Sequence, residues 1–380
     1  MQQSGSKVII RNYKEGDEVG IIKLLALNWR HLTDKNALKY WSWEYKECPR
    51  EAIVKVAEHD GKIVGHYALL PLTMRHKMET LIGAKAEGGI IHPNYRGKAG
   101  IKFLPSKEQG TIYHLLITGA LEEANEKGIK LVWGFPNKIA IKGQVKAGYT
   151  HMVIPVSSFI LPVNISRTMK YILSQFSITE DKKEAVSLLP KSLRKWLTTV
   201  SLPDLEALHI ENVKINEGLN GSENFWDNYK EQNSSITIER TKEYLQWRSI
   251  DNPVLEQKIF TASNPEGVNA IVAVAIVRKG KIVEGRIVDM LCLKGHEKDM
   301  RLLSAYAVRF LRNQGVDFIT TWMINNQSSN VYQQLLKQVN FLELPLQLMD
   351  VLVRGFDLPN HYITDPENWY VTMTFTEGVA

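Results

Sequence analysis

The chain has 380 residues and a formal net charge of +6, with 44% apolar and 23% charged residues. This composition excludes a disordered or fibrous chain and allows two globular domains, while the charge is too small and too scattered to indicate a nucleic-acid partner. Two distant cysteines, Cys48 and Cys292, exclude a disulfide framework, and without an apolar leader or an apolar run near 18 residues we expect a cytoplasmic protein with no membrane span.

Hydrophobic spacing predicts alternating strands and helices along the first half. The expected strands are residues 8–12, 52–58, 62–70, 81–92, 129–133 and 153–159, and the expected helices start near residues 14 and 111. Asp60-Gly61, between two of these strands, predicts a tight hairpin turn. Gly128 is typical of a helix C-terminal cap, so the second helix should end near Lys127.

The second half repeats landmarks of the first half in the same order. In the first half, residues 40–43 (Tyr-Trp-Ser-Trp) are followed by Pro49. In the second half, residues 244–247 (Tyr-Leu-Gln-Trp) are followed by Pro253 at the same spacing. Two further pairs of segments correspond in the same way: 127–132 with 314–319, and 146–149 with 338–341. Three matching landmarks indicate a duplicated domain.

These landmarks, and a change of pattern between them, give the expected domain limits. We expect an N-terminal domain at residues 1–160, a helical connector at 161–208 and a C-terminal domain at 209–380. Within the connector, residues 166–176 and 188–199 have the spacing of amphipathic helices.

The stretch between residues 92 and 116 combines the features of an anion-binding loop. It joins an expected strand to an expected helix, whose first backbone N–H groups have no partner inside the helix and lie at the positive end of its dipole. Arg96 and Lys98 add positive charge, and glycine lets a phosphate approach the backbone closely. The second half has no such loop after its strand at residues 286–293, so only the first half is expected to bind a phosphate ligand.

Several segments resemble, in order, the acyl-CoA-binding core of the GNAT superfamily of N-acetyltransferases: residues 92–98 (His-Pro-Asn-Tyr-Arg-Gly-Lys), the helix through Gly128, the strand to Trp133 and residues 135–149. The resemblance covers residues 7–160, and the duplication is similar to that of tandem-domain members. It implies an α/β (α+β) fold with two tandem GNAT-like domains, each a mixed, mostly antiparallel twisted sheet flanked by helices. Some tandem members acylate amino sugars for bacterial surface polysaccharides, and this chain resembles those of anthrose biosynthesis.

The pyrophosphate loop of the family is interrupted here by an insert, residues 99–109. Across the insert, the pattern consists of Arg96, Gly97 and Lys98 followed by Gly110, Thr111 and Ile112. The resemblance implies that these six residues bind the CoA phosphates, although Ile112 departs from the small residue of the family pattern. The insert is either a flap that becomes ordered over bound CoA or a surface loop without a role.

Two adjacent glycines, Gly88 and Gly89, lie inside an expected strand and predict a bulge or a close approach of another backbone. Their alternative role is only to relieve crowding. By resemblance, the N–H of Gly89 or Ile91 faces the thioester carbonyl, and Asn137 lies near the pantetheine arm. Asn137 is equally typical of a cap for the loop in which it lies.

The attacking amine must be neutral, so it must lose a proton. Glu87 is the carboxylate nearest to the expected reaction centre and is the first candidate base, with a solvated strand carboxylate as the alternative. His92 is the second candidate, although a histidine before proline is also typical of a structural role. The family often has a tyrosine that protonates the leaving thiolate at the position of Gln144, so a general acid from that position is doubtful.

Trp29, Trp41 and Trp43 are candidates for the acceptor site because aromatic rings stack on sugars and bases. His66 is a further candidate: it shares an expected strand near the cleft with Tyr67, and at most one of these two neighbours faces in. Tryptophans at helical spacing are also typical of a core. No Cys or His cluster has the spacing of metal ligands, so we expect no metal.

The resulting hypothesis is an acyl-CoA-dependent N-acyltransferase that uses acetyl-CoA or a longer or hydroxylated acyl-CoA. The acyl group would pass directly to a primary amine of a small molecule, such as a dTDP-linked 4-amino-4,6-dideoxy sugar, in a monomer or homodimer. The alternatives are a non-catalytic acyl-CoA-binding module, an enzyme for aminoglycoside or peptide amines, and an aminoacyl-tRNA-dependent peptidyl transferase. The last of these would need a basic stripe, which is absent from the sequence.

Overall fold

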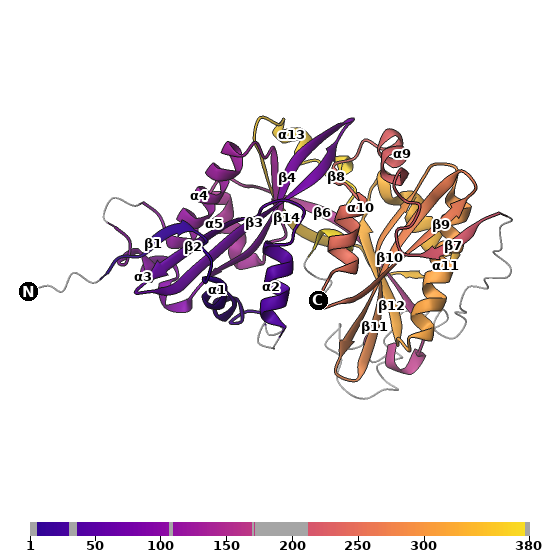
Figure 1. The fold of residues 1–380 in the computed structure, drawn as a ribbon, viewed down its shortest axis with the longest axis horizontal. Coiled ribbons are helices and arrows are strands. Elements are labelled where there is room, and N and C mark those ends of the chain that lie inside the picture. Colours follow the sequence, from indigo (N-terminus) through magenta and orange to yellow (C-terminus); the bar gives the residue numbers. More distant parts are fainter. Residues whose placement is uncertain (1–5, 30–35, 106–108, 169–170, 172–211, 377–380) are drawn as a thin grey trace, which may run out of the picture.

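A computed structural model describes residues 6–29, 36–105, 109–168, 171 and 212–376. Two halves of similar construction lie side by side, the first indigo to magenta and the second mainly orange to yellow in Figure 1. The first half contains β1 (Ile9–Asn12), α1 (Glu18–Leu25), α2 (Ala37–Tyr45), β2 (Ile53–His59), β3 (Lys62–His76), β4 (Glu79–Ile91), α3 (Gly97–Ile101), α4 (Ile112–Glu126), β5 (Leu131–Gly134), α5 (Lys138–Lys146) and β6 (Thr150–Pro162).

The second half follows nearly the same order of elements. It contains β7 (Lys214–Glu217), α9 (Phe225–Gln232), β8 (Thr237–Ile238), α10 (Lys242–Leu245), the π-helical turn η3 (Gln246–Ile250), β9 (Glu256–Asn264), β10 (Gly267–Lys279), β11 (Ile282–Cys292), α11 (Glu297–Asn313), β12 (Phe318–Ile324), α12 (Asn330–Gln338), β13 (Leu342–Glu343), β14 (Gln347–Gly355) and α13 (Asn360–Ile363).

Within the described residues, fourteen strands form one sheet in the order β1-β2-β3-β4-β5-β14-β6-β12-β11-β10-β9-β7, with β13 beside β6 and β8 beside β3. The β4–β5 and β11–β12 pairs are parallel, and the other named pairs of this sheet are antiparallel. The strand order of the second half mirrors that of the first. The expected fold class, two tandem GNAT-like halves with mostly antiparallel sheets, is confirmed.

The two halves exchange strands where they meet. β14 of the second half pairs with β5 of the first, β6 of the first pairs with β12 of the second, and β6 and β14 pair with each other. The expected domain limit at residues 160 and 161 stays a prediction, but β6 continues to Pro162 and serves the sheets of both halves. The expected connector helices at 166–176 and 188–199 lie largely outside the described residues.

Local sequence signals fix several elements of the first half. Asp60 and Gly61 have φ values of 49° and 71°, as the expected hairpin turn requires, and Gly128 has φ 73° just after α4. β3 continues to His76, although the strand was expected to end before Pro71. Pro71 is tolerated within the strand, which pairs with β4 along this length and with β8 at Met74.

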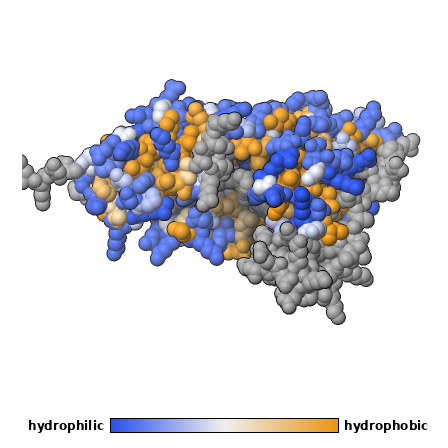
Figure 2. Space-filling view, turned by 90° about the horizontal axis from the view of Figure 1, so that it is seen from below, coloured by the Kyte–Doolittle hydropathy of each residue, from blue (hydrophilic) through white to orange (hydrophobic). Residues whose placement is uncertain are grey.

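Helices cover both faces of the first half. Ile21 and Leu24 of α1 and Trp41 of α2 belong to one large core cluster, whereas Ile112 and Leu116 of α4 belong to a separate cluster on the other face. On the face seen in Figure 2, apolar side chains gather in a recess between the two halves, while the outer surfaces are largely hydrophilic. Alternate residues of the central strands therefore supply two cores.

The insert in the phosphate loop is mostly part of the fold. Its first residues belong to α3, and Leu104 is buried in the core beside α4. The backbone N–H of Val8 donates to Phe103 O (2.7 Å), and the Phe103 ring contacts those of His59 and Tyr95. The described part of the insert therefore packs against the residue before β1 and the end of β2, which corrects the expectation of a surface loop without a role. The flap over bound CoA stays a prediction, and residues 106–108 lie outside the described chain.

A reciprocal pair of tryptophans joins the two halves. Trp43 of α2 and Trp247 of η3 stack with ring centroids 5.3 Å apart and an interplanar angle of 25°. Each indole N–H donates to the backbone carbonyl of the other tryptophan, at 2.8 and 2.9 Å. These residues are the matching tryptophans of the two sequence landmarks, so the duplication brings equivalent positions into contact with each other.

We expect Trp43→Ala to lower the free energy of unfolding by about 3 to 5 kcal/mol, because it removes a buried ring and the hydrogen bond that its indole N–H donates. Trp247→Ala should cost a similar amount, and the double variant should cost at least about 1 kcal/mol less than the sum, because both changes remove the same contact. Urea unfolding measures all three values. The control combines Trp43→Ala with Ile117→Ala, which lies in the other core cluster. The losses of unfolding free energy of these two changes should add, because the residues share no contact. Additivity of the two tryptophan changes would contradict the coupling.

Candidate active site

The sheet of the first half opens beside β4. β4 and β5 pair only between Gly83–Lys85 and Leu131–Trp133, whereas β4 continues to Ile91. After Gly134 the chain turns into α5, so the edge of β4 that faces β5 is open along residues 86–91. A pocket with a volume of about 70 Å³ lies at this opening, and we call it the β4 pocket; it is lined by Trp29, Tyr67, Ala86, Glu87, Gly88, Gly89, Tyr113, Gly134, Phe135, Pro136, Asn137, Ala140 and Gln144.

The expected bulge in β4 is confirmed. His66 of β3 is opposite Ile90 and Ala68 is opposite Glu87, so Gly88 and Gly89 share a single partner residue. Gly88 has φ 60°, and a Cβ on it would lie 2.8 Å from the His66 ring. His66 Nδ1 donates to Gly88 O at 2.8 Å, so a buried histidine holds the bulge in place.

Backbone N–H groups of β4 face the opening. The N–H of His92 donates to Val64 O of β3, and alternate N–H groups of a strand point to the same edge. The N–H groups of Ile91 and Gly89 therefore point away from β3, toward the open edge. Their contact with a thioester carbonyl stays a prediction.

Arg96 and the start of α4 lie at the outer end of the same edge. Arg96 Nε donates to Ile91 O (2.8 Å), which leaves the outer guanidinium nitrogens available to an anion. Thr111 is the N-cap of α4 and its hydroxyl accepts from the N–H of His114 (3.2 Å). Ile112 is buried in the core, so only its backbone faces this site, which explains why a large residue is tolerated there. Gly97 and Lys98, by contrast, begin α3, and Gly110 precedes the cap with φ 100°.

Glu87 is the carboxylate that lines the β4 pocket, and it is buried. Its Oε2 lies 2.6 Å from Lys85 Nζ, on the same face of β4 as α2. Glu44 of α2 is also buried, and burial raises the pKa of Glu44, with a further rise from the negative charge of Glu87. A solvated role for Glu87 is therefore wrong: it belongs to a buried group of charges.

The second half contributes to this group of charges. The positive charge of Arg248, in η3, lowers the pKa of Glu44 and so opposes the rise. The Arg248 guanidinium lies 5.7 and 6.0 Å from the ring centroids of Trp43 and Trp247, and it donates to Thr376 O (2.6 Å). The surroundings of Glu87 thus depend on the contact between the halves.

The other expected site residues are dispersed. Trp29 and Asn137 line the β4 pocket, where Asn137 also caps α5 by accepting from the N–H groups of Ile139 and Ala140. Trp41, Trp43 and His66 are at most 2% exposed and do not line the pocket. Because they are buried away from the pocket, the expectation that they contact an acceptor there is wrong.

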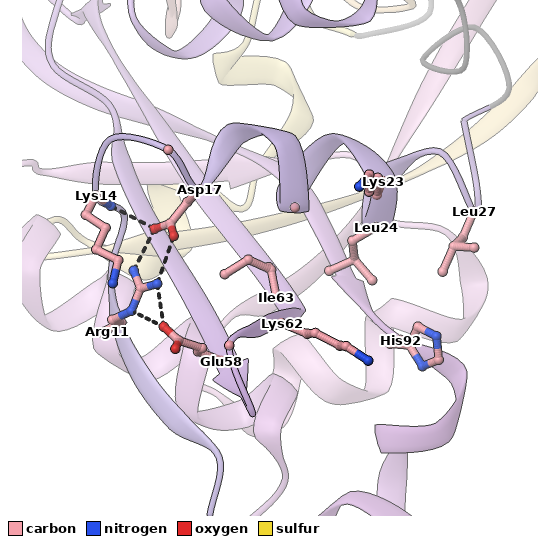
Figure 3. A pocket seen from close by; sticks show the side chains of 13 residues that line it. Arg11, Lys14, Asp17, Lys23, Leu24, Leu27, Glu58, Lys62, Ile63 and His92 are labelled. Atoms are coloured by element: carbon pink, nitrogen blue, oxygen red, sulfur yellow. Dashed lines mark hydrogen bonds and ion pairs between the residues drawn. The ribbon is translucent and has the colours of Figure 1, made fainter.

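His92 lies outside the β4 pocket, in a groove of about 720 Å³ that we call the α1 groove. Figure 3 shows Arg11 held between Asp17 and Glu58 at one end of this groove, and Lys62 pointing toward His92 at the other. The groove is lined by Arg11, Lys14, Gly16, Asp17, Gly20, Lys23, Leu24, Leu27, Glu58, Gly61, Lys62, Ile63 and His92. Exposed lysines give it a positive lining.

Tyr113 is a polar side chain of the pocket that the sequence did not indicate. It lies in the first turn of α4, and its hydroxyl accepts from Gln144 Nε2 at 2.9 Å. Gln144 stands where the family often has a tyrosine. An aromatic residue one position after the predicted phosphate-binding residues was the available signal, but helical spacing alone did not distinguish it from a core residue.

The corresponding opening of the second half is filled. β11 and β12 pair only between Glu284–Arg286 and Phe318–Thr320, and the C-terminal segment then occupies the gap. Its Tyr370 hydroxyl donates to Met290 O (2.6 Å) and its Thr372 hydroxyl to Asp289 (2.7 Å). Asp289 also forms a buried ion pair with Arg240 (2.9 Å). These contacts leave the open edge of the first half as the candidate site.

Other features bear on function more weakly. The helices of the described chain include none that is long and apolar enough to cross a membrane. In the same residues, no group of three or more His, Cys, Asp or Glu side chains could hold a metal ion. Cys48 and Cys292 are free and buried, and neither lines the β4 pocket.

The buried His66 makes stability depend on pH. Burial lowers the pKa of His66 to about 4, whereas an unfolded histidine has a pKa near ~6.5. Between these values only the unfolded chain binds the proton, so the free energy of unfolding falls as pH falls, by up to about 1.4 kcal/mol per pH unit. His66→Gln retains a donor for Gly88 O but does not titrate. We expect the difference in urea stability between wild type and this variant to be constant above pH 7 and to change steadily below pH 6.5; parallel curves would contradict it.

Comparison with known proteins agrees with this geometry. The family model of the acetyltransferase (GNAT) domain matches residues 9–152. No curated protein matches the chain by sequence. Similar solved structures include a GCN5-related N-acetyltransferase from Anabaena variabilis, with 12% identity, a TM-score of 0.58 and coverage of 92% of this chain and 73% of that chain. A protein of unknown function from Enterococcus faecalis, described as a probable N-acyltransferase, has 10% identity, a TM-score of 0.60 and the same coverages.

A third similar structure is N-myristoyltransferase from Saccharomyces cerevisiae with bound myristoyl-CoA, with 13% identity, a TM-score of 0.55 and coverage of 92% of this chain and 84% of that chain. At these identities the likeness shows the fold, and it extends over both halves of the chain. Residues 9–152 thus match the family model of the GNAT acetyltransferase domain, and the chain as a whole shares the fold of these solved structures.

Proposed function

We propose that this protein is an acyl-CoA-dependent N-acyltransferase that passes an acyl group directly from a CoA thioester to a primary amine. The observation that carries the proposal is the β4 pocket, which lies at an open strand edge and is lined by Gly89 and Glu87. The GNAT domain match supports it. So does the shared fold with the yeast N-myristoyltransferase, which holds an acyl-CoA.

The residues present fit an acyl-CoA. Arg96 is anchored at Ile91 O, and the free N–H groups at the start of α4 favour phosphate oxygens. Deeper in, Gln144 Oε1 is buried without a hydrogen-bond partner among the described residues, so it can accept from an amide N–H of the pantetheine arm. A pocket of about 70 Å³ favours a short acyl group such as acetyl over a long chain.

The chemistry assigned to the pocket needs no covalent enzyme intermediate. Oriented N–H groups stabilise negative charge that develops on the carbonyl oxygen. Glu87 takes the proton that the amine loses, directly or through water, and Lys85 lies 2.6 Å from its carboxylate. Neither cysteine lies at the pocket to act as a nucleophile.

The α1 groove favours an acceptor that carries negative charge as well as an amine. Lys14, Lys23 and Lys62 are exposed along it, with His92 at one end. Leu27 lines the groove and Trp29, two residues later, lines the β4 pocket, so the segment that follows α1 borders both. A nucleotide-linked amino sugar, such as the dTDP-linked 4-amino-4,6-dideoxy sugar expected from the sequence, has this combination. The cytoplasmic location and the monomeric or homodimeric state stay predictions.

The function is tested by measuring release of CoA thiol from acetyl-CoA with a panel of amines: nucleotide-linked amino sugars, the same sugars without the nucleotide, aminoglycosides and peptides. We expect turnover with a nucleotide-linked sugar and at least about tenfold lower kcat/KM without the nucleotide. Arg96→Glu should weaken acetyl-CoA binding at least about tenfold in calorimetry, because it reverses the charge beside the phosphates.

The outcomes separate the alternatives. Binding of acetyl-CoA without turnover on any amine would favour the non-catalytic module. Preference for aminoglycosides or peptides would support an N-acyltransferase but would exclude a nucleotide-linked sugar as its acceptor. Unchanged affinity of Arg96→Glu for acetyl-CoA would show that the loop containing Arg96 does not bind the CoA phosphates.

We expect Glu87→Gln to lower kcat about 100-fold while the Kd for acetyl-CoA changes less than about threefold, because the amide cannot accept the amine proton. Steady-state kinetics and calorimetry provide the two numbers, and the melting temperature reports whether the buried Lys85 is tolerated without its charged partner. Wild-type turnover in a folded variant would exclude Glu87 from the mechanism.

A further inference from the structure

The hydroxyl of Tyr113 lies beside the expected reaction centre. A Cβ on Gly89 would lie 3.1 Å from Tyr113 Oη, so the hydroxyl fills the space that the missing side chain leaves. The ring is held by Gly143, where a Cβ would lie 3.0 Å from Tyr113 Cδ1, and by an edge-on contact with Tyr67. The same Gly89 supplies one of the N–H groups of the open edge, so a hydroxyl at this point is within reach of a sulfur bound to the acyl carbon.

The direction of its hydrogen bond leaves the proton of Tyr113 free. Gln144 Nε2 donates to the phenol oxygen at 2.9 Å, so this bond does not use the tyrosine's own proton. Both side chains line the β4 pocket, and Gln144 is 7% exposed. The arrangement holds the phenol in place and offers its proton to the pocket.

The environment suits a proton donor. Burial raises the pKa of Tyr113, and the hydrogen bond from Gln144 acts in the opposite direction. The phenol therefore stays protonated at neutral pH, while an N–H donor stands ready to stabilise the phenolate once the proton has left.

Resting on the proposed function, we infer that Tyr113 is the general acid that protonates the departing CoA thiolate and that Gln144 positions it. The amine nitrogen forms a C–N bond with the acyl carbon as the C–S bond breaks. One amine proton passes to Glu87, and the Tyr113 proton passes to sulfur. The phenolate regains a proton from solvent and Glu87 releases one, so the products are the amide and CoA with a free thiol.

Neighbouring tyrosines do not fit this role. Tyr67 lines the pocket, but its hydroxyl is bonded to that of Tyr149 at 2.7 Å, with both residues buried. Tyr149 does not line the pocket. In the family, a tyrosine at the position of Gln144 often protonates the thiolate. Here Tyr113 of α4 takes that role, and Gln144 holds its hydroxyl in place.

The test compares Tyr113→Phe with wild type, and Tyr149→Phe serves as the matched control because it removes a hydroxyl outside the pocket. Steady-state kinetics with acetyl-CoA and the best amine give kcat and KM, and calorimetry gives the affinities for CoA and for desulfo-CoA, which lacks the sulfur. Gln144→Glu replaces an N–H donor by an acceptor of the same shape. Melting temperatures check the fold of each variant.

We expect Tyr113→Phe to lower kcat about 10- to 100-fold, with KM for acetyl-CoA changed less than about threefold. Wild type should bind CoA more tightly than desulfo-CoA, and this preference should disappear in Tyr113→Phe because the hydroxyl contacts the sulfur. Gln144→Glu should lose as much kcat as Tyr113→Phe although the hydroxyl is retained, and Tyr149→Phe should stay within about twofold of wild type.

A folded Tyr113→Phe variant with wild-type kcat, or with an unchanged preference for CoA over desulfo-CoA, would overturn the assignment. Wild type that binds no CoA or forms no amide would instead overturn the proposed function, so the two failures are distinguishable.

Discussion

The exchange of strands between the halves is the constraint on which the site depends. β14 pairs with β5 along Leu131–Gly134, so β5 is held from its far side while β4 extends past it alone. Because β5 cannot move to close on β4 without breaking this ladder, the open edge is a built feature of the sheet. The tryptophan pair fixes the same junction from the helices, through stacked rings and reciprocal hydrogen bonds. The two contacts place Arg248 of one half near Glu44 and Glu87 of the other.

Duplication produced two such openings, and the chain retains one. In the second half the Arg240–Asp289 ion pair and the C-terminal segment occupy the space beside β11. A buried ion pair persists only when both charges and their remaining polar atoms are satisfied, and here Thr372 and Thr237 supply further partners. In the first half the Lys85–Glu87 pair borders a pocket instead. The same sheet geometry thus gives an open pocket in one half and a filled core in the other.

Several parts of the site followed from local sequence. Gly88-Gly89 predicted the bulge because adjacent glycines weaken a regular strand, and Gly128 predicted the end of α4 because capping is chemistry of neighbouring residues. The interpretations that failed concerned burial. Trp41, Trp43 and His66 have the composition of a binding surface, yet they are core residues, since burial depends on which helix packs on which strand. Leu104 shows the same limit, because a segment that looks like an insert in a loop fills a core.

The sequence by itself determined the repeat, the α/β class, the loop that joins β4 to the helices after it, and the strand that carries Glu87. These are set by periodicity, turn chemistry and the order of short motifs, all of which are properties of neighbouring residues. Only the tertiary structure decided that β6 and β14 pair with strands of the other half, that one of the two openings is filled, and that Tyr113 and Gln144 meet at Gly89. These contacts join residues far apart in the chain, and the hydrophobic pattern that brings such residues together does not specify which polar atoms then face each other.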